Sequence, residues 1–245
     1  MKHRLELGIL PQPDGTTCGP TCLNALYSYL GDKISLEQTV AETHRLDEGG
    51  TYAVFLAQHA LRRGYQATLY TFNLRVFDPT WFMLSRQAMQ SRLRERMKVL
   101  AHTPRLVTVI EGYIEFLELG GEVLLEDLTP GLIRKYLNRD QPILTGLSST
   151  YLYRAMREHG PTLEDDDVRG DPQGHFVVLC GYDKSDRTVL VADPMHPNPA
   201  FQGLQYLVNI DRVICSILLG VMTQDAELLI LDPPTPPLSV TPPPP

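Results

Sequence analysis

The chain has 245 residues, 43% of them hydrophobic, and a formal net charge of -7. This length is enough for one α+β domain with a full core, and the negative charge argues against a general nucleic-acid binder or a protein that binds anionic membranes. No run approaches the ~18 apolar residues that span a bilayer, and the N-terminus lacks the apolar core of a signal peptide. Four cysteines without framework spacing predict reduced thiols and a cytoplasmic location.

The first predicted helix begins at Cys18. The apolar side chains that share one face of this helix are Cys22, Leu23, Leu26, Tyr27 and Leu30. Gly31 follows as a stop signal, while Gly19 and Pro20 fit only in the first turn, where backbone N–H groups have no partner within the helix. Cys18 therefore lies where the helix dipole favours negative charge, which is the condition that favours a nucleophilic thiolate.

Helices and strands alternate through the rest of the chain. The predicted helices are residues 35–44 with a capping box at Ser35–Gln38, 51–64 with Thr51 as the cap, 80–119 with an interruption near Thr103 and Pro104, 130–137 and 210–219. The predicted strands are residues 66–72, 123–125, 142–147 and 228–231. Residues 233–245 are rich in proline and predict a disordered tail outside the fold.

Residues 174–194 are typical of a β-hairpin, with two β-rich runs joined by a polar turn that ends at Asp186. If this turn leaves Tyr182 opposite Asp186, then His175 faces Asp193. A slip of one residue would turn Asp193 to the other face, because side chains alternate along a strand. The hairpin can thus place a carboxylate beside an imidazole, as a Cys–His–Asp relay requires.

The motif Gln12-x5-Cys18-Gly, with a late His175-Phe-Val-Val and a closing Asp193-Pro, resembles the bacteriocin-processing (double-glycine leader) peptidases and their soluble cytoplasmic relatives. These bacterial enzymes belong to the papain-like cysteine peptidase superfamily. The resemblance is carried by the segments around these four residues, and the middle of the chain matches only in its order of helices and strands.

The resemblance implies a role for each of the four residues. Cys18 would be the nucleophile and His175 the general base and acid, while Asp193 would orient the imidazole and Gln12 would donate to the oxyanion. One position departs from the family pattern: an acidic residue commonly precedes the Cys-Gly pair, and Thr17 stands here. The catalytic set is unaffected, whereas specificity for a leader peptide is not implied.

Each of these residues also has a structural alternative. Cys18 is otherwise an inert buried thiol, Gln12 a loop cap, and Asp193 a turn residue before a proline. His175 by itself is otherwise a structural histidine, and the partner Asp193 favours the catalytic interpretation. Cys22 is interpreted as core packing, with a resolving thiol as its alternative role.

Three further groups of residues are interpreted without a catalytic role. The alternation that places His175 on one face places Cys180 on the other, which removes it as a ligand or nucleophile. The basic residues between Arg86 and Arg105 are interpreted as a solvated helix face. The remaining histidines and cysteines show no metal spacing, so neither a metal nor a cofactor is predicted.

We therefore expect an α+β, papain-like cysteine peptidase fold, in which a helical N-terminal lobe packs on a C-terminal antiparallel sheet. Residues 1–232 would form this single domain, with a helical insertion at about 78–120. The expected function is hydrolysis of a peptide or isopeptide bond in a peptide or protein substrate through a Cys18 thioester. The alternatives are an acyltransferase that uses the same site and a non-catalytic peptide-binding module. No nucleic-acid partner is expected, and the sequence leaves the oligomeric state open.

Overall fold

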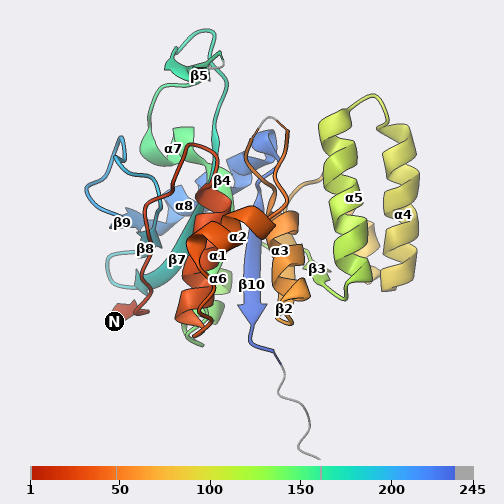
Figure 1. Ribbon diagram of the computed structural model, residues 1–245, viewed down its shortest axis with the longest axis horizontal. Coiled ribbons are helices and arrows are strands. Elements are labelled where there is room, and N and C mark those ends of the chain that lie inside the picture. The colour runs from red at the N-terminus through yellow and green to blue at the C-terminus, as the bar shows by residue number, and fades with distance from the viewer. Residues whose placement is uncertain (1, 48, 161, 235–245) are drawn as a thin grey trace, which may run out of the picture.

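The computed structural model describes residues 2–47, 49–160 and 162–234 (Figure 1). Its centre is one sheet of eight strands in the order β3-β2-β10-β4-β7-β8-β9, with β1 beside β7. The strands are β1 (Lys2–Arg4), β2 (Gln66–Thr71), β3 (Glu122–Leu124), β4 (Ile143–Ser148), β7 (Gly174–Asp183), β8 (Thr188–Ala192), β9 (Gln205–Asn209) and β10 (Glu227–Asp232). A separate hairpin of β5 (Glu158–His159) and β6 (Glu164–Asp165) projects at the top of Figure 1.

The sheet differs from the predicted C-terminal antiparallel sheet in two ways. The strands β1 and β2 come from the N-terminal half of the chain and β3 from its middle, and β3 runs parallel to β2. All other neighbouring strands of the sheet pair antiparallel. The parallel pair arises because the long helical segment between β2 and β3 returns the chain to the end of the sheet at which β2 began.

Helices cover both faces of this sheet. They are α1 (Cys18–Tyr29), α2 (Leu36–Glu42), α3 (Ala53–Arg62), η1 (Pro79–Met83), α4 (Arg86–Val99), α5 (Pro104–Glu118), α6 (Pro130–Leu137), α7 (Ser149–Tyr153), α8 (Ile210–Leu219) and η2 (Gly220–Thr223). In Figure 1, α1, α2 and α3 lie in front of the sheet, α8 lies behind it, and α4 and α5 stand at the right. Within the described part of the chain, no helix is long and apolar enough to cross a membrane.

Most helix ends follow local sequence signals. The Ser35 hydroxyl caps α2 by accepting a hydrogen bond from the Gln38 N–H at 3.1 Å, as predicted. The predicted cap of α3 is wrong, because Tyr52 is the N-cap and the Thr51 hydroxyl donates instead to the His44 carbonyl at 2.7 Å. Five elements were not predicted from the sequence: β1, β5, β6, α7 and β9. Of the predicted tail, residues 235–245 lie outside the described residues.

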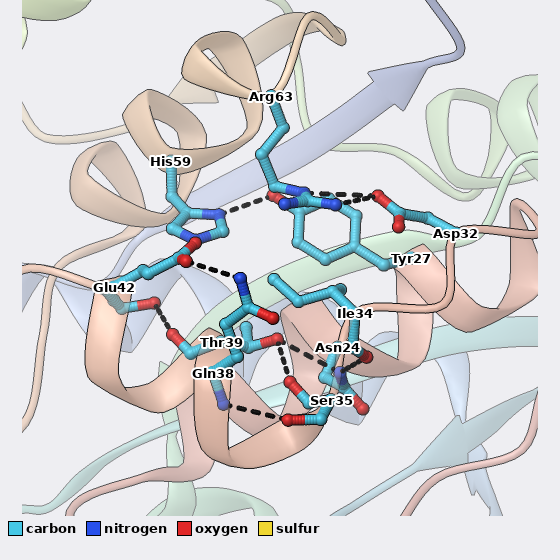
Figure 2. Close-up of polar contacts among 11 residues, drawn as sticks. Asn24, Tyr27, Asp32, Ile34, Ser35, Gln38, Thr39, Glu42, His59 and Arg63 are labelled. Carbon is cyan, nitrogen blue, oxygen red and sulfur yellow. Dashed lines mark hydrogen bonds and ion pairs between the residues drawn. The ribbon is translucent and has the colours of Figure 1, made fainter.

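Helices α1, α2 and α3 are joined by a network of polar contacts (Figure 2). The Tyr27 hydroxyl of α1 lies 2.8 Å from His59 Nδ1 of α3, and His59 Nε2 lies 3.2 Å from a Glu42 carboxylate oxygen of α2. Arg63, just after α3, pairs with Asp32, just after α1, at 2.6 Å. The network fixes α1 against its neighbours and so fixes the position of the first residue of α1, Cys18.

The predicted helical stretch 80–119 forms η1, α4 and α5, with a break at Thr103 and Pro104 as predicted. Helix α4 buries only Met89 and Leu93. Helix α5 approaches α3 so closely that a Cβ on Gly112 would lie 2.8 Å from Val54 and Phe55. Helix α5 is therefore part of the main core, and α4 is the outer helix of the pair.

Candidate active site

Cys18 is the first residue of α1 and is half-buried. The N-cap of α1 is Thr17, and its side chain makes no capping hydrogen bond. The first backbone N–H groups of α1 therefore do not donate to the Thr17 side chain. The close packing of α1 needs the glycine at position 19, because a Cβ there would lie 2.7 Å from a Thr51 methyl carbon. The sequence Cys-Gly-Pro thus starts a helix whose first turn is closely packed around the thiol.

His175 is the second residue of β7 and pairs with Leu147 of β4. Its side chain is 3% exposed, and its Nε2 lies 2.8 Å from Oδ1 of Asp193. The Cys18 thiol lies close enough to the same ring to influence its charge. Because Nε2 is used by Asp193, the nitrogen left for Cys18 is Nδ1. The imidazole therefore bridges the residue at the start of α1 and the carboxylate after β8.

The contact between His175 and Asp193 depends on an irregular register in the hairpin. Near the turn, Tyr182 pairs with Val189, and not with Asp186 as the sequence analysis supposed. A β-bulge between Leu179 and Gly181 then shifts the pairing by one residue. Continued to the end of the hairpin, the shifted register brings Asp193 level with residue 177, two residues from His175 on the same face. Without the bulge, Asp193 would point to the opposite face.

Asp193 is fully buried and its carboxylate accepts five hydrogen bonds. Oδ1 accepts from His175 Nε2 and from the Met195 N–H at 2.9 Å. Oδ2 accepts from the Tyr153 hydroxyl at 2.7 Å, from Asn198 Nδ2 at 3.1 Å and from the Tyr206 hydroxyl. These donors provide the compensation that a buried carboxylate needs.

The charges of His175 and Asp193 shift each other's pKa. Burial acts to lower the pKa of His175, but the negative charges of Cys18 and Asp193 and its hydrogen bonds to both raise that pKa to about 10. Burial acts to raise the pKa of Asp193, whereas the charge of His175 and the hydrogen bonds from His175, Tyr206 and the Met195 N–H lower it. A protonated His175 ring beside an ionised Asp193 is therefore the state that this arrangement stabilises.

Gln12 lies in the loop before α1, and its backbone N–H donates to the Pro194 carbonyl at 2.9 Å. This bond joins the loop to the segment that follows Asp193. The side-chain Nε2 of Gln12 donates to the Asp14 carbonyl at 2.8 Å, and its Oε1 is buried without a hydrogen-bond partner among the described residues. The structure thus places Gln12 beside the end of the hairpin, with one amide hydrogen used inside its own loop.

The other cysteines are buried or distant from this constellation. Cys22 is fully buried, with its Sγ 3.2 Å from the Phe176 carbonyl, and burial raises its pKa well above the ordinary value. Burial raises the pKa of Cys180 to about 12. Cys215 is exposed. Within residues 2–47, 49–160 and 162–234, no cluster of three or more His, Cys, Asp or Glu side chains is arranged to hold a metal ion.

The three donors to Asp193 Oδ2 were not predicted from the sequence: they are Tyr153, Asn198 and Tyr206. Tyr206 had a weak signal, because Tyr206, Leu207 and Val208 form a short run of residue types that favour a strand. Tyr153 belongs to the short helix α7, and Asn198 to the loop before β9. Neither has a local pattern that points to Asp193, which is distant from Tyr153 in the sequence.

The chain is similar to a known protein family and to solved structures. Residues 129–206, which contain His175 and Asp193, match the family model described as the Peptidase_C39 like family. A solved structure described as a C39-like peptidase from Bacillus anthracis superposes with a TM-score of 0.52 at 13% identity, covering 95% of this chain and 98% of that one. These two findings confirm the predicted resemblance and the papain-like α+β fold. No curated protein sequence matches the chain.

Two other solved structures are similar over most of their length. A double glycine motif protease from an AMS/PCAT transporter, in complex with its leader peptide, has a TM-score of 0.45 at 12% identity and covers 94% of each chain. The peptidase domain of Streptococcus ComA, a bifunctional ABC transporter of a quorum-sensing pathway, has a TM-score of 0.43 at 12% identity. That match covers 93% of this chain and 99% of the other.

Proposed function

We propose that this protein is a cysteine peptidase that cleaves a peptide or isopeptide bond in a peptide or protein substrate. The observation that carries the proposal is the imidazole of His175, which lies between Asp193 Oδ1 at 2.8 Å and the Cys18 thiol at the start of α1. This order of nucleophile, imidazole and carboxylate is the arrangement of a nucleophilic triad. The C39-like family match and the fold support the same class of reaction.

In the proposed reaction, the Cys18 thiolate attacks the carbonyl carbon of the scissile bond. The His175 imidazolium gives its proton to the leaving amine, and a thioester to Cys18 remains. Water then attacks the thioester while His175 takes up its proton, and the carboxylic acid product leaves. This step restores the thiolate and the imidazolium, and Asp193 holds the ring in place throughout.

The oxyanion of each tetrahedral intermediate needs donors. In this proposal they are the backbone N–H of Cys18 and the second amide hydrogen of Gln12, since the bond to Asp14 uses only one of the two. Loss of one such donor typically lowers turnover by about 10²-fold or more. We expect Gln12→Ala to show a loss of this size with the fold retained, and an unchanged rate would make Gln12 a loop residue.

Mass spectrometry of peptide-library digests tests the function directly. The wild type should give defined cleavage products, Cys18→Ala should give none, and Cys215→Ala should behave as the wild type, because Cys215 is exposed and outside the site. Equal products from Cys18→Ala would contradict the proposal. Added amine nucleophiles distinguish hydrolysis from acyl transfer, because transfer gives an amide of the amine in place of the free acid.

A further inference from the structure

The carboxylate of Asp193 has more donors than contact with His175 requires. Besides His175 and the Met195 N–H, three side chains converge on the outer oxygen, Oδ2. They come from three segments of the chain: Tyr153 from α7, Asn198 from the loop after Asp193, and Tyr206 from β9. The side chain of Asp193 is completely shielded from solvent, so these groups stand where water would otherwise bind it.

Each of the three donors is itself held in one orientation. The Tyr206 ring stacks on Phe201 with ring centres 3.8 Å apart and planes 8° apart, and the Tyr153 ring meets Phe201 edge-on at 6.3 Å. The Asn198 Oδ1 accepts the backbone N–H groups of Ala200 and Phe201, so its Nδ2 must face Asp193. Rigid, pre-oriented donors of this kind favour the charged form of an acceptor, because they need no rearrangement to solvate it.

We propose that Tyr153, Asn198 and Tyr206 are positioning residues for the proposed reaction: together they hold Asp193 ionised, with Oδ1 directed at His175, and so keep His175 charged beside Cys18. This inference rests on the proposed function for its role in turnover, although the charge state itself does not need a substrate. Burial and the charge of Asp193 raise the pKa of both Tyr153 and Tyr206 far above the ordinary value, which favours the protonated hydroxyls that donate to Asp193.

The test compares Tyr153→Phe, Tyr206→Phe and the double variant with Tyr182→Phe. Tyr182 is a matched control because it lies on the same strand as His175 and its hydroxyl donates to Asn138, away from Asp193. Two measurements need no substrate: the pH dependence of Cys18 alkylation, and NMR titration of the His175 ring nitrogens. The peptidase kcat/KM against pH is the third measurement.

Each lost hydroxyl should make Asp193 easier to protonate. We expect the acid limb of the alkylation curve to move to higher pH by about one unit in each single variant and further in the double variant. The His175 ring should lose its proton at lower pH than in the wild type, and Tyr182→Phe should match the wild type. If the double variant does not fold, 3-fluorotyrosine at position 206, a stronger donor, should move the acid limb the opposite way.

Unchanged alkylation and titration curves in folded variants, with only a lower thermal midpoint, would overturn the inference and leave the three residues a structural role. The outcome is separable from that of the proposed function. If the wild type cleaves no peptide but the curves move as expected, the peptidase proposal fails and the positioning role stands. If the wild type cleaves peptides and the curves do not move, the peptidase proposal stands and the positioning role fails.

Discussion

The four cysteines of this chain differ in burial and in their surroundings, and this difference makes Cys18 chemically testable. Cys22 and Cys180 are buried with raised pKa values, whereas Cys18 is half-buried beside His175. The thiolate is the reactive form of cysteine, and a neighbouring imidazolium stabilises it.

We expect iodoacetamide to modify Cys18 much faster than the other three cysteines at pH 6, where an ordinary thiol has well under about 1% thiolate. Peptide mapping by mass spectrometry after timed alkylation measures all four rates in one sample. His175→Ala should reduce the rate at Cys18 and leave that at the exposed Cys215 unchanged. Comparable rates at all four positions would argue against an activated thiol.

Among the strands, the bulge in β7 has the clearest consequence for the site, because it decides which face Asp193 occupies. Gly181 follows the bulge and pairs with Arg4 of the antiparallel strand β1. A Cβ at Gly181 would lie 2.6 Å from the His3 carbonyl oxygen and 3.1 Å from Arg4 Cα, so β1 and β7 cannot both keep their places with a larger residue there.

Gly181→Ala should therefore lower the free energy of unfolding by about 1–3 kcal/mol, the usual cost of a forced backbone shift. Urea unfolding followed by circular dichroism measures this. Gly15→Ala is the control, because a Cβ there has nothing within 4 Å. An equal effect of the two substitutions would show that the contact between β1 and β7 contributes nothing.

The polar network of α1, α2 and α3 (Figure 2) predicts a pH dependence of stability. Burial lowers the pKa of His59, and the charge of Arg63 adds to this, while the bond to Glu42 opposes it. The lowered pKa favours the neutral ring at pH 7, in the form that donates from Nε2 to Glu42 and accepts from Tyr27 at Nδ1. The unfolded chain binds a proton at His59 near pH ~6.5. The stabilisation is thus present above this pH and is lost as the pH falls through the lower pKa of the folded state.

We expect the free energy of unfolding to decline between pH 7 and pH 5 by up to about 1.4 kcal/mol per pH unit from this residue. His59→Gln should show a flatter profile over the same range, although it is less stable at pH 7. His102→Gln, at an exposed position, should retain the wild-type slope. A His59→Gln profile parallel to the wild type would assign the acid sensitivity to other groups.

For the molecule as a whole, the insertion at about 78–120 has two unequal halves. Helix α5 buries seven residues, namely Leu106, Val109, Ile110, Gly112, Tyr113, Phe116 and Leu117. Its Tyr113 hydroxyl also donates to the buried Glu227 of β10 at 3.1 Å. Helix α4 lies outside it and holds Arg94 in a surface ion pair with Glu118. The division into one domain over residues 1–232 with this insertion stays a prediction.

This asymmetry predicts unequal costs of substitution. Phe116→Ala should lower the free energy of unfolding by about 3–5 kcal/mol, because it leaves a cavity at a fully buried position. Arg94→Ala should change it by less than about 1 kcal/mol, since it removes one exposed ion pair. Chemical denaturation of both variants is the measurement. Similar small effects would mean that α5 can be separated from the main core.

Sequence alone predicted the elements whose signals are local. Helix α1 starts at Cys18 and ends before Gly31, which has the positive φ of 84° that glycine adopts readily, and α6 and α8 have the predicted bounds. The four candidate site residues came from short motifs of the same local kind. Their catalytic roles stay predictions, and the contact of His175 with Asp193 is what the structure adds.

Tertiary structure decided the features that depend on distant parts of the chain. One extra residue at the bulge in β7 decides whether Asp193 lies on the same face of the hairpin as His175. The sequence around Cys180 gives no indication of this bulge. Strand β1 forms only because the edge of β7 beyond β4 is free to pair with it. The donors around Asp193 Oδ2 come from α7, a loop and β9, and they meet only when the sheet is assembled. Local propensity and periodicity determine where helices and strands begin. A buried charge such as the Asp193 carboxylate instead needs donors that are close to it in space, wherever they lie in the sequence.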